Sequence, residues 1–576
     1  MRRLAAANLL KRKASSSVMM GLERRMMRKY HVGMVVEGSH QFKTSFGIGN
    51  IRQQEKKKEM VEVEQPSKAS KHNDTIYAMS SGFSTTCAVS VVRVSGPKAL
   101  EIVAKMSNLK VDKLESRRAY YCTLFDPVDH SIPIDKVLLL YFKSPNSFTG
   151  EDIVEIHAHG SKAVISQLMK ALGCDGIGFR PADPGEFTKR AFLNRKMDLT
   201  EVEGLSDLIH AQTEHQRIQA LKQLSGELSH IVTSWKREML LCVAHVTAFI
   251  DFGDDNGLEE SVVYREKIMP SVKKLASELN YYLNVSKSRL GERLREGHGI
   301  RCALLGAPNA GKSSLLNVLA EKDVAIVSDQ AGTTRDVVEV QMNLKGWPVT
   351  VADTAGLRDH KDISTNSETG KHHLIEIEGM KRAIKKAVQA DVIILVLDSA
   401  GDSDISADEM FEFCFEKLKE EENSDISNII ENKKIFIVNN KIDKSNQETL
   451  HIFKLKNGRE IPTFNISCKT KDGVDNFITE LSRTVENIFT GKDDQFFEKD
   501  IGSQQAEHAL LITRERHRVS FSKTLKSLEL AMEEQDQIEI AAEHIRQAHK
   551  SLCEVTGEVD IEEILDVVFK EFCIGK

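Results

Sequence analysis

The segment GAPNAGKS at residues 306–313 constrains the fold of this chain more than any other part of its sequence. It fits the phosphate-binding pattern G-x-x-x-x-G-K-[ST]. An apolar run at 300–305 precedes it, and a helix-compatible segment at 314–320 follows it. The order strand, glycine loop, helix predicts that backbone N–H groups face phosphate oxygens at the positive end of the helix. Lys312 would then reach the β- and γ-phosphates, and the Ser313 hydroxyl would bind Mg²⁺.

Two further segments fit the switch loops of a nucleotide-dependent protein. SDQAGTTRD at 328–336 occupies the position of a first switch, where Thr334 could complete Mg²⁺ coordination while a γ-phosphate is bound. DTAG follows an expected strand at 349–352. Asp353 would hold Mg²⁺ through water, and the Gly356 N–H would meet the γ-phosphate. These segments argue against the alternative that the glycine loop is a chance turn.

The base-binding part of the pattern comes last. NKID at 440–443 follows the expected strand 435–439, and the Asp443 carboxylate can accept two hydrogen bonds from guanine that adenine cannot donate. SCK at 467–469 follows the expected strand 463–466 and would brace the base from its other side. Four motifs in order predict GTP rather than ATP as the ligand. The predicted GTP-binding residues are Asn309, Ala310, Gly311, Lys312, Ser313, Ser314, Ser328, Asp329, Gln330, Ala331, Gly332, Thr333, Thr334, Asp353, Thr354, Ala355, Gly356, Asn440, Lys441, Asp443, Ser467, Cys468 and Lys469.

The glutamine that commonly positions the attacking water is missing after the second switch motif. Leu357 stands in its place. GTP hydrolysis therefore needs another device, and the stretch from Arg358 to Glu378 offers only charged candidates.

Size and composition limit the other functions open to the chain. Its 576 residues and 64.6 kDa predict three or four domains. A net charge of −6 means that nucleic acid could bind only at a local basic patch. The nine cysteines form no C-x-x-C pair, which favours a reducing compartment over a disulfide framework or a structural zinc site.

The first 36 residues carry nine basic side chains and one acid, Glu23, with serines between them. This composition is typical of an organellar transit peptide, and a basic disordered tail is the alternative. Residues 37–73 are polar and charged, as expected of a linker.

From residue 74 the pattern becomes mixed α and β. Strands are expected at 88–94 and 137–142, and helices at 98–106 and 162–172. A turn-rich segment, PNSFTGED at 145–152, leads into an alternating strand that places Glu155, His157 and His159 on one face. Either a metal site or a half-exposed strand face would explain these three residues. Residues 180–194 are expected to form a loop that enters a helix.

From 198 to 296 proline is nearly absent and apolar residues recur at helical spacing, for example at Leu221, Leu224, Leu228, Ile231 and Trp235. The helical pattern stops at the nucleotide-binding segment and resumes from 506 to 572. One bundle divided by an inserted domain would explain this order. Two unrelated bundles are the alternative.

Several of these motifs together resemble the MnmE/TrmE family of tRNA modification GTPases, including its mitochondrial members. The resemblance covers residues 74–576 and rests on PNSFTGED at 145–152, PGEF at 184–187 with AFLN at 191–194, GAPNAGKS at 306–313, IVSDQAGTTRD at 326–336, DTAGLR at 353–358 and FCIGK at 572–576. The first and the last of these are the most specific.

The resemblance implies a multidomain fold. An α+β, aminomethyltransferase-like folate-binding domain would precede an α-helical bundle, into which a Ras-like α/β P-loop GTPase domain is inserted. The implied segments are 1–36 (transit peptide), 37–73 (linker), 74–196 (folate-binding and dimerisation domain), 197–298 (first helical part), 299–490 (GTPase domain) and 491–576 (second helical part with the CIGK ending).

It also implies site residues beyond the nucleotide motifs. A 5-formyl-tetrahydrofolate-type one-carbon donor would meet Arg93, Glu155, Lys196 and Lys576, with Cys573 nearby as a candidate catalytic residue. K⁺ would take the place of an arginine finger, and its ligands would be Asn309, Ser328, Gln330 and Thr333. The Mg²⁺ ligands would be Ser313 and Thr334. Glu376 would orient the water, and Arg358 would shape the second switch.

Two departures from the family pattern affect these assignments. The glycine-rich loop of the family is poorer in glycine here, at 81–87, and an insertion at 359–375 precedes Glu376.

The function implied is GTP hydrolysis coupled to modification of C5 of the wobble uridine, U34, in organellar tRNAs. The chain would act as a homodimer with an FAD- and NADH-dependent flavoprotein of the MnmG type, in mitochondria or alternatively plastids. The attached group would be of the carboxymethylaminomethyl or taurinomethyl type. Two other functions stay open: a non-catalytic GTPase switch in ribosome assembly, and a free-standing folate aminomethyltransferase.

Overall fold

The computed structural model describes residues 74–81, 87–252, 264–285, 289–307, 309–322, 339–353, 385–399, 433–444, 453–454, 460–490, 510–559, 568–569, 572 and 575. All of them belong to one compact unit that starts at residue 68. The predicted transit peptide and linker lie outside these residues, and so does most of the 81–87 loop.

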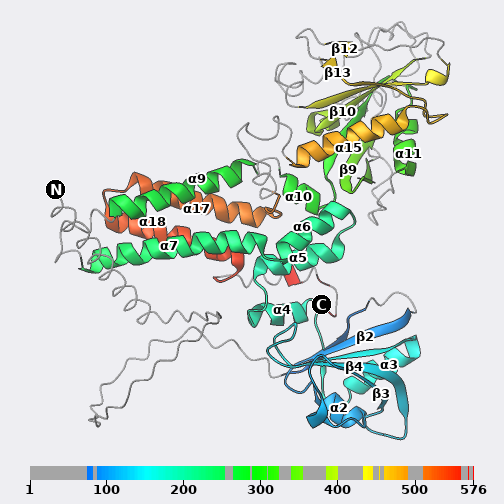
Figure 1. Cartoon of the computed structure of the whole chain (residues 1–576), viewed down its shortest axis with the longest axis vertical. Coiled ribbons are helices and arrows are strands. Elements are labelled where there is room, and N and C mark those ends of the chain that lie inside the picture. Colours follow the sequence, from blue (N-terminus) through cyan, green and yellow to red (C-terminus); the bar gives the residue numbers. More distant parts are fainter. Residues whose placement is uncertain are drawn as a thin grey trace, which may run out of the picture. The chain divides into compact units, whose positions relative to one another are not determined.

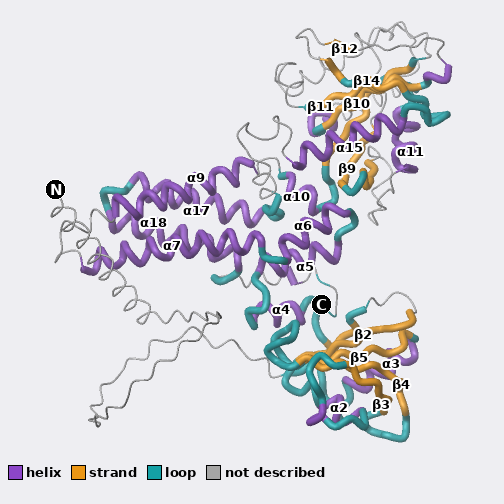
Figure 2. Tube along the Cα trace, viewed as in Figure 1, coloured by secondary structure: helices purple, strands orange, loops and turns teal. Residues whose placement is uncertain are grey.

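The N-terminal part is a six-stranded sheet (Figure 2). Two of its helices pack on one face, and Phe187 of a third helix packs on Ile76 and Ala78 on the other face. Its strand order is β3-β4-β5-β2-β1-β6, and only β1 and β6 pair in parallel. Apolar residues of α2 and α3 pack on the inward residues of the sheet. The elements are β1 (Ile76–Met79), β2 (Cys87–Ser95), α2 (Glu101–Met106), the 3₁₀ turn Val111–Lys113, β3 (Ala119–Phe125), β4 (Pro133–Phe142), β5 (Ile153–Gly160), α3 (Lys162–Leu172), β6 (Arg180–Pro181) and α4 (Glu186–Leu193).

The α+β prediction for this region is confirmed. The predicted first helix is shorter than expected, because residues 98–100 form a turn before α2. Strand β5 alternates as expected, with Glu155 and His157 half-buried and His159 exposed. No group of three or more possible metal ligands occurs within the described part of the chain.

The helical segments before and after the nucleotide-binding insertion form one bundle. Its buried core joins residues of α7 and α9 to residues of α17 and α18, and the four helices run side by side (Figure 1). The prediction of a divided bundle is therefore confirmed. The helices are α5 (Leu199–His210), α6 (Glu214–Leu224), α7 (Glu227–Phe252), a π-helical turn (Tyr264–Ile268), α9 (Met269–Val285), α10 (Leu290–Arg295), α17 (Glu515–Glu533) and α18 (Ile538–Thr556).

The apolar stripe from Leu221 to Trp235 does not lie on one helix. Helix α6 ends at Leu224, and Gly226, with φ of +84°, turns the chain before α7 begins. Leu221 is consequently exposed, whereas Trp235 is buried against Phe521. Glycine adopts this left-handed backbone conformation without a steric penalty, so the helical spacing continues across a real break.

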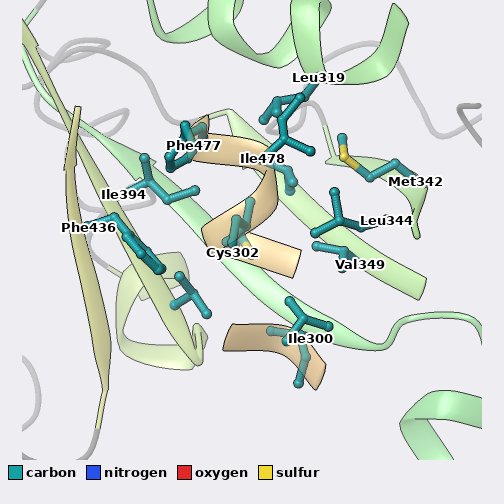
Figure 3. Packing of buried hydrophobic residues seen from close by; sticks show 14 of the residues in the cluster. Ile300, Cys302, Leu319, Met342, Leu344, Val349, Ile394, Phe436, Phe477 and Ile478 are labelled. Carbon is teal, nitrogen blue, oxygen red and sulfur yellow. The ribbon is translucent and has the colours of Figure 1, made fainter. Parts of the chain in front are cut away.

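The inserted domain is a second six-stranded sheet, of order β14-β11-β10-β7-β9-β8, in which only β8 is antiparallel to its neighbour. In its core, apolar residues of α11 and α15 pack on apolar residues of the strands. Figure 3 shows part of this core, including Cys302 and Ile394 from strands and Phe477 from α15. The elements are β7 (Ile300–Leu305), α11 (Lys312–Lys322), β8 (Glu339–Leu344), β9 (Trp347–Asp353), β10 (Val392–Asp398), β11 (Lys434–Asn440), the 3₁₀ turn Ile442–Lys444, β12 (Phe453–Lys454), β13 (Glu460–Ile461), β14 (Thr463–Asn465) and α15 (Val474–Thr490).

Among the described helices, none is both long and apolar enough to cross a bilayer.

The divided bundle predicts that α18 contributes to stability as strongly as the helices before the insertion. Leu552→Ala, at a fully buried position, should lower the free energy of unfolding of the bundle by about 2–5 kcal/mol, because it removes packed atoms and leaves a cavity. Ile540→Ala, on the same helix but 43% exposed, is the matched control and should cost about 0.5 kcal/mol or less.

Urea unfolding followed by fluorescence of buried Trp235, in a Trp347→Phe background, measures this transition, because these are the two tryptophans of the chain. Equal effects of the two alanine substitutions would contradict a shared core.

Candidate functional site

The predicted phosphate loop leaves the carboxyl end of β7, the strand between β10 and β9. Its two glycines stand where a side chain cannot. A Cβ on Gly306 would lie 2.2 Å from the Val396 carbonyl oxygen, and one on Gly311 would lie 2.1 Å from Nδ2 of Asn440. Both residues also have positive φ, +146° and +97°. The loop therefore requires glycine both for its backbone conformation and for its close packing.

The phosphate loop opens onto a cavity of about 510 Å³, which lies within the usual size range of small-molecule sites. Lys312 begins α11, and its ammonium donates to the carbonyls of Gly306 and Ala307 at 3.1 and 2.9 Å. This contact holds the cation beside the loop that a phosphate would enter. The cavity is lined by Asn309, Gly311, Lys312, Ser313, Ser314, Asn440, Lys441, Asp443, Lys444, Cys468 and Lys469.

One buried side chain, Asn440, joins the phosphate end of the cavity to its base end. Its Nδ2 donates to the Ala310 carbonyl at 3.0 Å, and its Oδ1 accepts from the Cys468 N–H at 3.1 Å. It is only 2% exposed. Because both polar atoms have a partner inside the protein, Asn440 fixes the separation of the two loops. Its amide keeps one further donor hydrogen and one further acceptor lone pair, so its contact with the nucleotide stays a prediction.

The carboxylate expected to read guanine is held in place by a hydroxyl. Ser467 Oγ donates to Asp443 Oδ1 at 2.7 Å, and Ser467 itself is fully buried. That hydrogen bond, with nearby Lys469 and Lys444, lowers the pKa of Asp443, so the carboxylate stays ionised and accepts hydrogen bonds. Lys441, with φ of +67°, pairs with Asp398 at 2.6 Å.

Cys468, beside Ser467, is partly buried, and its burial affects the reactivity of its thiol. The Cys468 thiol has its pKa raised to about 11 by desolvation, so it is neutral at physiological pH. It can pack beside a base but is not an activated nucleophile.

The structure thus brings together the phosphate loop, NKID and SCK. Asp353 ends β9 on the same side of the sheet, because parallel strands place their carboxyl ends at one edge. The remaining predicted residues of the two switches and of the catalytic set lie outside the described residues; they are Ser328, Asp329, Gln330, Ala331, Gly332, Thr333, Thr334, Thr354, Ala355, Gly356, Arg358, Glu376 and Cys573. Two residues that the sequence analysis left out, Ala307 and Lys444, contact Lys312 or line the cavity.

A second candidate site lies in the N-terminal sheet. Arg93 on β2 and Glu155 on β5 are register partners, and the guanidinium binds the carboxylate at 3.0 Å. The guanidinium also lies over the rings of Phe148 and Phe187, at 5.2 and 5.8 Å from their centroids. The guanidinium is therefore held against two aromatic rings. Phe187 is fully buried, so only the half-buried Phe148 can also contact a ligand.

Two observations test whether this site fits a pterin. The buried Nε2 of His157 has no hydrogen-bond partner among the described residues and lies 3.7 Å from Glu155 Oε2. A cavity of about 440 Å³ adjoins the pair and includes Phe148 and Lys196 in its lining. The carboxylate can accept from the N–H groups of a pterin, and the His157 nitrogen, without a hydrogen-bond partner among the described residues, can donate or accept one further bond.

Gly575, near the end of the chain, packs against this domain. Ser80 Oγ donates to the Gly575 carbonyl at 3.1 Å, and a Cβ on Gly575 would lie 2.1 Å from the Met79 carbonyl oxygen. Gly575 lies beside the end of β1. Strand β1 is two positions in the sheet from β5, which carries Glu155. The predicted folate contact Lys576 and the predicted catalytic Cys573 lie outside the described residues.

The loop that carries Phe148 is held by a buried arginine that the sequence analysis did not single out. Arg190 is fully buried and binds Glu151, Asp74 and Glu186 at 3.2, 2.9 and 3.0 Å. Its only sequence signal is an arginine one helical turn after Glu186. The network explains why the turn-rich segment before β5 carries an acid at position 151.

Known proteins match the chain over most of its length. A family profile described as "GTP-binding protein TrmE N-terminus" matches residues 75–196, and one described as "MnmE helical domain" matches residues 199–573. The "tRNA modification GTPase MnmE" of Paramagnetospirillum magneticum is 40% identical over 506 residues, which is 88% of this chain and 100% of that protein.

Two similar relatives are named as mitochondrial. The "tRNA modification GTPase gtpbp3, mitochondrial" of Dictyostelium discoideum is 38% identical and covers 89% of this chain and 97% of its own length. The "5-taurinomethyluridine-[tRNA] synthase subunit GTPB3, mitochondrial" of Homo sapiens is 39% identical and covers 87% of this chain and 93% of its own length.

The close packing around Gly311 predicts that adding one methyl group at this position weakens nucleotide binding. Gly311→Ala should weaken the binding of a fluorescent guanine nucleotide about 100-fold, because the new Cβ collides with Asn440 and strains the backbone. The control is Gly178→Ala, which has a similar positive φ of +70° but no atom within 4 Å of the added Cβ. Nucleotide titration of both variants measures the difference, and a Gly311→Ala variant with wild-type affinity would refute the packing argument.

Proposed function

Because the chain belongs to the MnmE/TrmE family of tRNA modification GTPases, we propose that it hydrolyses GTP and modifies C5 of the wobble uridine of organellar tRNAs with an FAD-dependent partner. The observation that carries the proposal is the cavity bounded by the phosphate loop, NKID and SCK, in a chain that aligns with the full length of a tRNA modification GTPase. A tetrahydrofolate donor would supply the one-carbon unit.

Each end of the cavity has a distinct part in binding GTP. The loop from Gly306 to Ser313 would surround the phosphates with backbone N–H groups, and Lys312 would turn from the loop carbonyls to the β- and γ-phosphates. Asp443 would accept the two guanine hydrogen bonds, since Ser467 holds its carboxylate in place. The fixed Asn440 supports this placement of the nucleotide, because it sets the distance between the phosphate loop and the SCK loop.

For hydrolysis we assign Mg²⁺ to Ser313 and Thr334 and K⁺ to Asn309, Ser328, Gln330 and Thr333. A K⁺ ion would offset negative charge developing at the β–γ bridge, where other GTPases use an arginine. Asn309 supports this assignment, because it lines the cavity and holds a left-handed backbone with φ of +62°. Glu376 would orient the attacking water, and Arg358 would shape the second switch.

For the one-carbon donor we assign Arg93, Glu155, Lys196 and Lys576, with Cys573 as a candidate catalytic residue. Glu155 would accept from the N–H edge of the pterin, while Arg93 would lie beside its carbonyl. The half-buried ring of Phe148 and the Nε2 of His157, which has no hydrogen-bond partner among the described residues, support this placement. The contact between Gly575 and Ser80 supports the folate-binding role of Lys576, because Lys576 is the next residue in the chain.

The proposed partners are a second copy of the chain and an MnmG-type flavoprotein that uses FAD and NADH. The sheet face opposite α2 and α3 supports self-association: Tyr121 and its register partner Leu138 are 69% and 45% exposed there. Human and Dictyostelium relatives named as mitochondrial support a mitochondrial location, with a plastid as the alternative, although bacterial relatives are equally similar. Either a glycine- or a taurine-derived group fits the proposal.

The K⁺ assignment predicts a cation-dependent turnover. GTP hydrolysis in the presence of the flavoprotein should fall by about tenfold or more when K⁺ is replaced by Na⁺, because the smaller ion fits the ligands poorly. Asn309→Gly keeps the positive φ but removes the side-chain oxygen, so its turnover should be low and equal in both salts. Multiple-turnover assays of phosphate release measure both. Equal wild-type rates in K⁺ and Na⁺ would remove Asn309 and the first switch from the mechanism.

The whole function is tested on tRNA. In cells that lack this protein, mass spectrometry of organellar tRNAs should show unmodified U34, and wild-type protein should restore it. Lys312→Ala should not restore it, because the phosphates lose their cation. The mass added at C5 also distinguishes glycine from taurine. Unchanged wobble uridines in the knockout would refute the proposal and favour a GTPase switch with another RNA target.

A further inference from the structure

The cavity beside the Arg93–Glu155 pair carries more positive charge than the proposed pterin contacts require. Its volume is about 440 Å³, and its lining includes two cations, Arg117 and Lys196. Three apolar side chains, Leu140, Phe142 and Phe148, form part of the same wall. A ligand that fits this cavity therefore has an apolar body and negatively charged groups.

Both cations reach the same short loop. Arg117 donates through Nη2 to the Asn146 carbonyl at 3.1 Å, and Lys196 donates through Nζ to the Pro145 carbonyl at 3.1 Å. No carboxylate pairs with either cation among the residues that the structure describes. Carbonyl oxygens orient a cation but do not neutralise it, so the two positive charges remain for a ligand.

The adjacent arginine differs in this respect. Arg118 pairs with Glu115 at 2.9 Å and lies over the ring of Tyr120 at 5.8 Å. It is not part of the cavity lining. Two neighbouring arginines thus have different environments: one is satisfied within the protein, and the other faces the cavity.

The backbone holds Arg117 in this position. Its φ is +66°, in the left-handed region that side chains other than glycine, asparagine and aspartate rarely adopt. Its N–H donates to the Tyr141 carbonyl at 2.7 Å, at the end of β4. This backbone conformation and the hydrogen bond to Tyr141 fix the point from which the Arg117 side chain reaches the cavity.

The cavity continues from the proposed pterin site. Leu140 is the register partner of Glu155 on the neighbouring strand, and Phe148 lies under the Arg93 guanidinium. A pterin held by Arg93 and Glu155 would therefore extend its ring substituent along Leu140 and Phe148. In a folate that substituent ends in glutamate, whose carboxylates would meet the two cations.

We infer that Arg117 acts with Lys196 to bind the carboxylates of the folate's glutamate tail, and that it makes the protein prefer folates with a γ-linked oligoglutamate chain. The inference rests on the folate proposal above and assigns a specificity-determining residue to that site. Arginine suits the task because its planar guanidinium binds a carboxylate through two parallel hydrogen bonds. Each added glutamate offers a further carboxylate, so affinity rises with tail length.

The test is a binding titration of the intact protein with 5-formyl-tetrahydrofolate carrying one or three glutamates. Wild-type protein should bind the triglutamate more tightly than the monoglutamate. Arg117→Ala should weaken triglutamate binding by about tenfold and largely remove the preference, because a charge-assisted contact is lost. Arg117→Lys, which keeps the charge, should recover part of it. Arg118→Ala removes the same charge from the adjacent position and should change affinity by less than about twofold.

A reduced pterin without a tail, 6-methyltetrahydropterin, separates the two ends of the site. It should bind equally to wild type and Arg117→Ala, because it does not reach the cations. Thermal unfolding followed by circular dichroism checks that each variant is folded as stably as the wild type. Arg117→Gln, a second variant without the positive charge, should bind folates as Arg117→Ala does.

The outcomes are distinguishable. If neither pterin nor folate binds any variant, the folate proposal and the inference both fail. If folates bind but Arg117→Ala and Arg118→Ala have the same effect, only the role of Arg117 is overturned. The role of Arg117 is also overturned if Arg117→Ala weakens tRNA binding and leaves folate affinity unchanged, because the cations would then serve a nucleic-acid surface.

Discussion

The chain enters and leaves its nucleotide-binding domain at one place in the helical bundle, and the rest of the arrangement depends on that closure. Gln219 on α6 donates to the Gly291 carbonyl at the entry and to the Leu510 carbonyl at the exit, at 3.3 and 2.6 Å. A Cβ on Gly291 would lie 2.5 Å from the Ile512 carbonyl oxygen, so the two segments are in direct contact. Any rotation of the inserted domain therefore acts on both segments together.

A second contact joins the inserted domain to the same helix. His215 on α6 stacks on Trp347 with ring centroids 3.5 Å apart and an interplanar angle of 7°, and Trp347 stacks in turn on Phe489. Burial lowers the pKa of His215, so the imidazole is neutral in this stack at physiological pH. Because Trp347 begins β9, whose other end is Asp353 at the second switch motif, a nucleotide-dependent change there has a rigid strand through which to reach the bundle.

Much of the fold and of the nucleotide site could be predicted from the sequence, for reasons that differ between elements. The four nucleotide motifs are local, and each needs particular residue types, so their strands and loops were located by spacing alone. The helical bundle was predictable from periodicity and the near absence of proline. The stripe from Leu221 to Trp235 shows the limit of this reasoning: one glycine with positive φ ends a helix while the apolar spacing continues.

What the sequence by itself determined is the chemistry of the nucleotide site: a glycine loop for phosphate and an aspartate for guanine. Only the tertiary structure decided which of these groups meet. It made Asn440 a brace between two loops, buried Arg190 beneath the loop that carries Phe148, and turned Arg117 rather than Arg118 toward a cavity. The physical reason is that such roles depend on register, burial and a few unusual backbone angles, which bring together residues far apart in the chain.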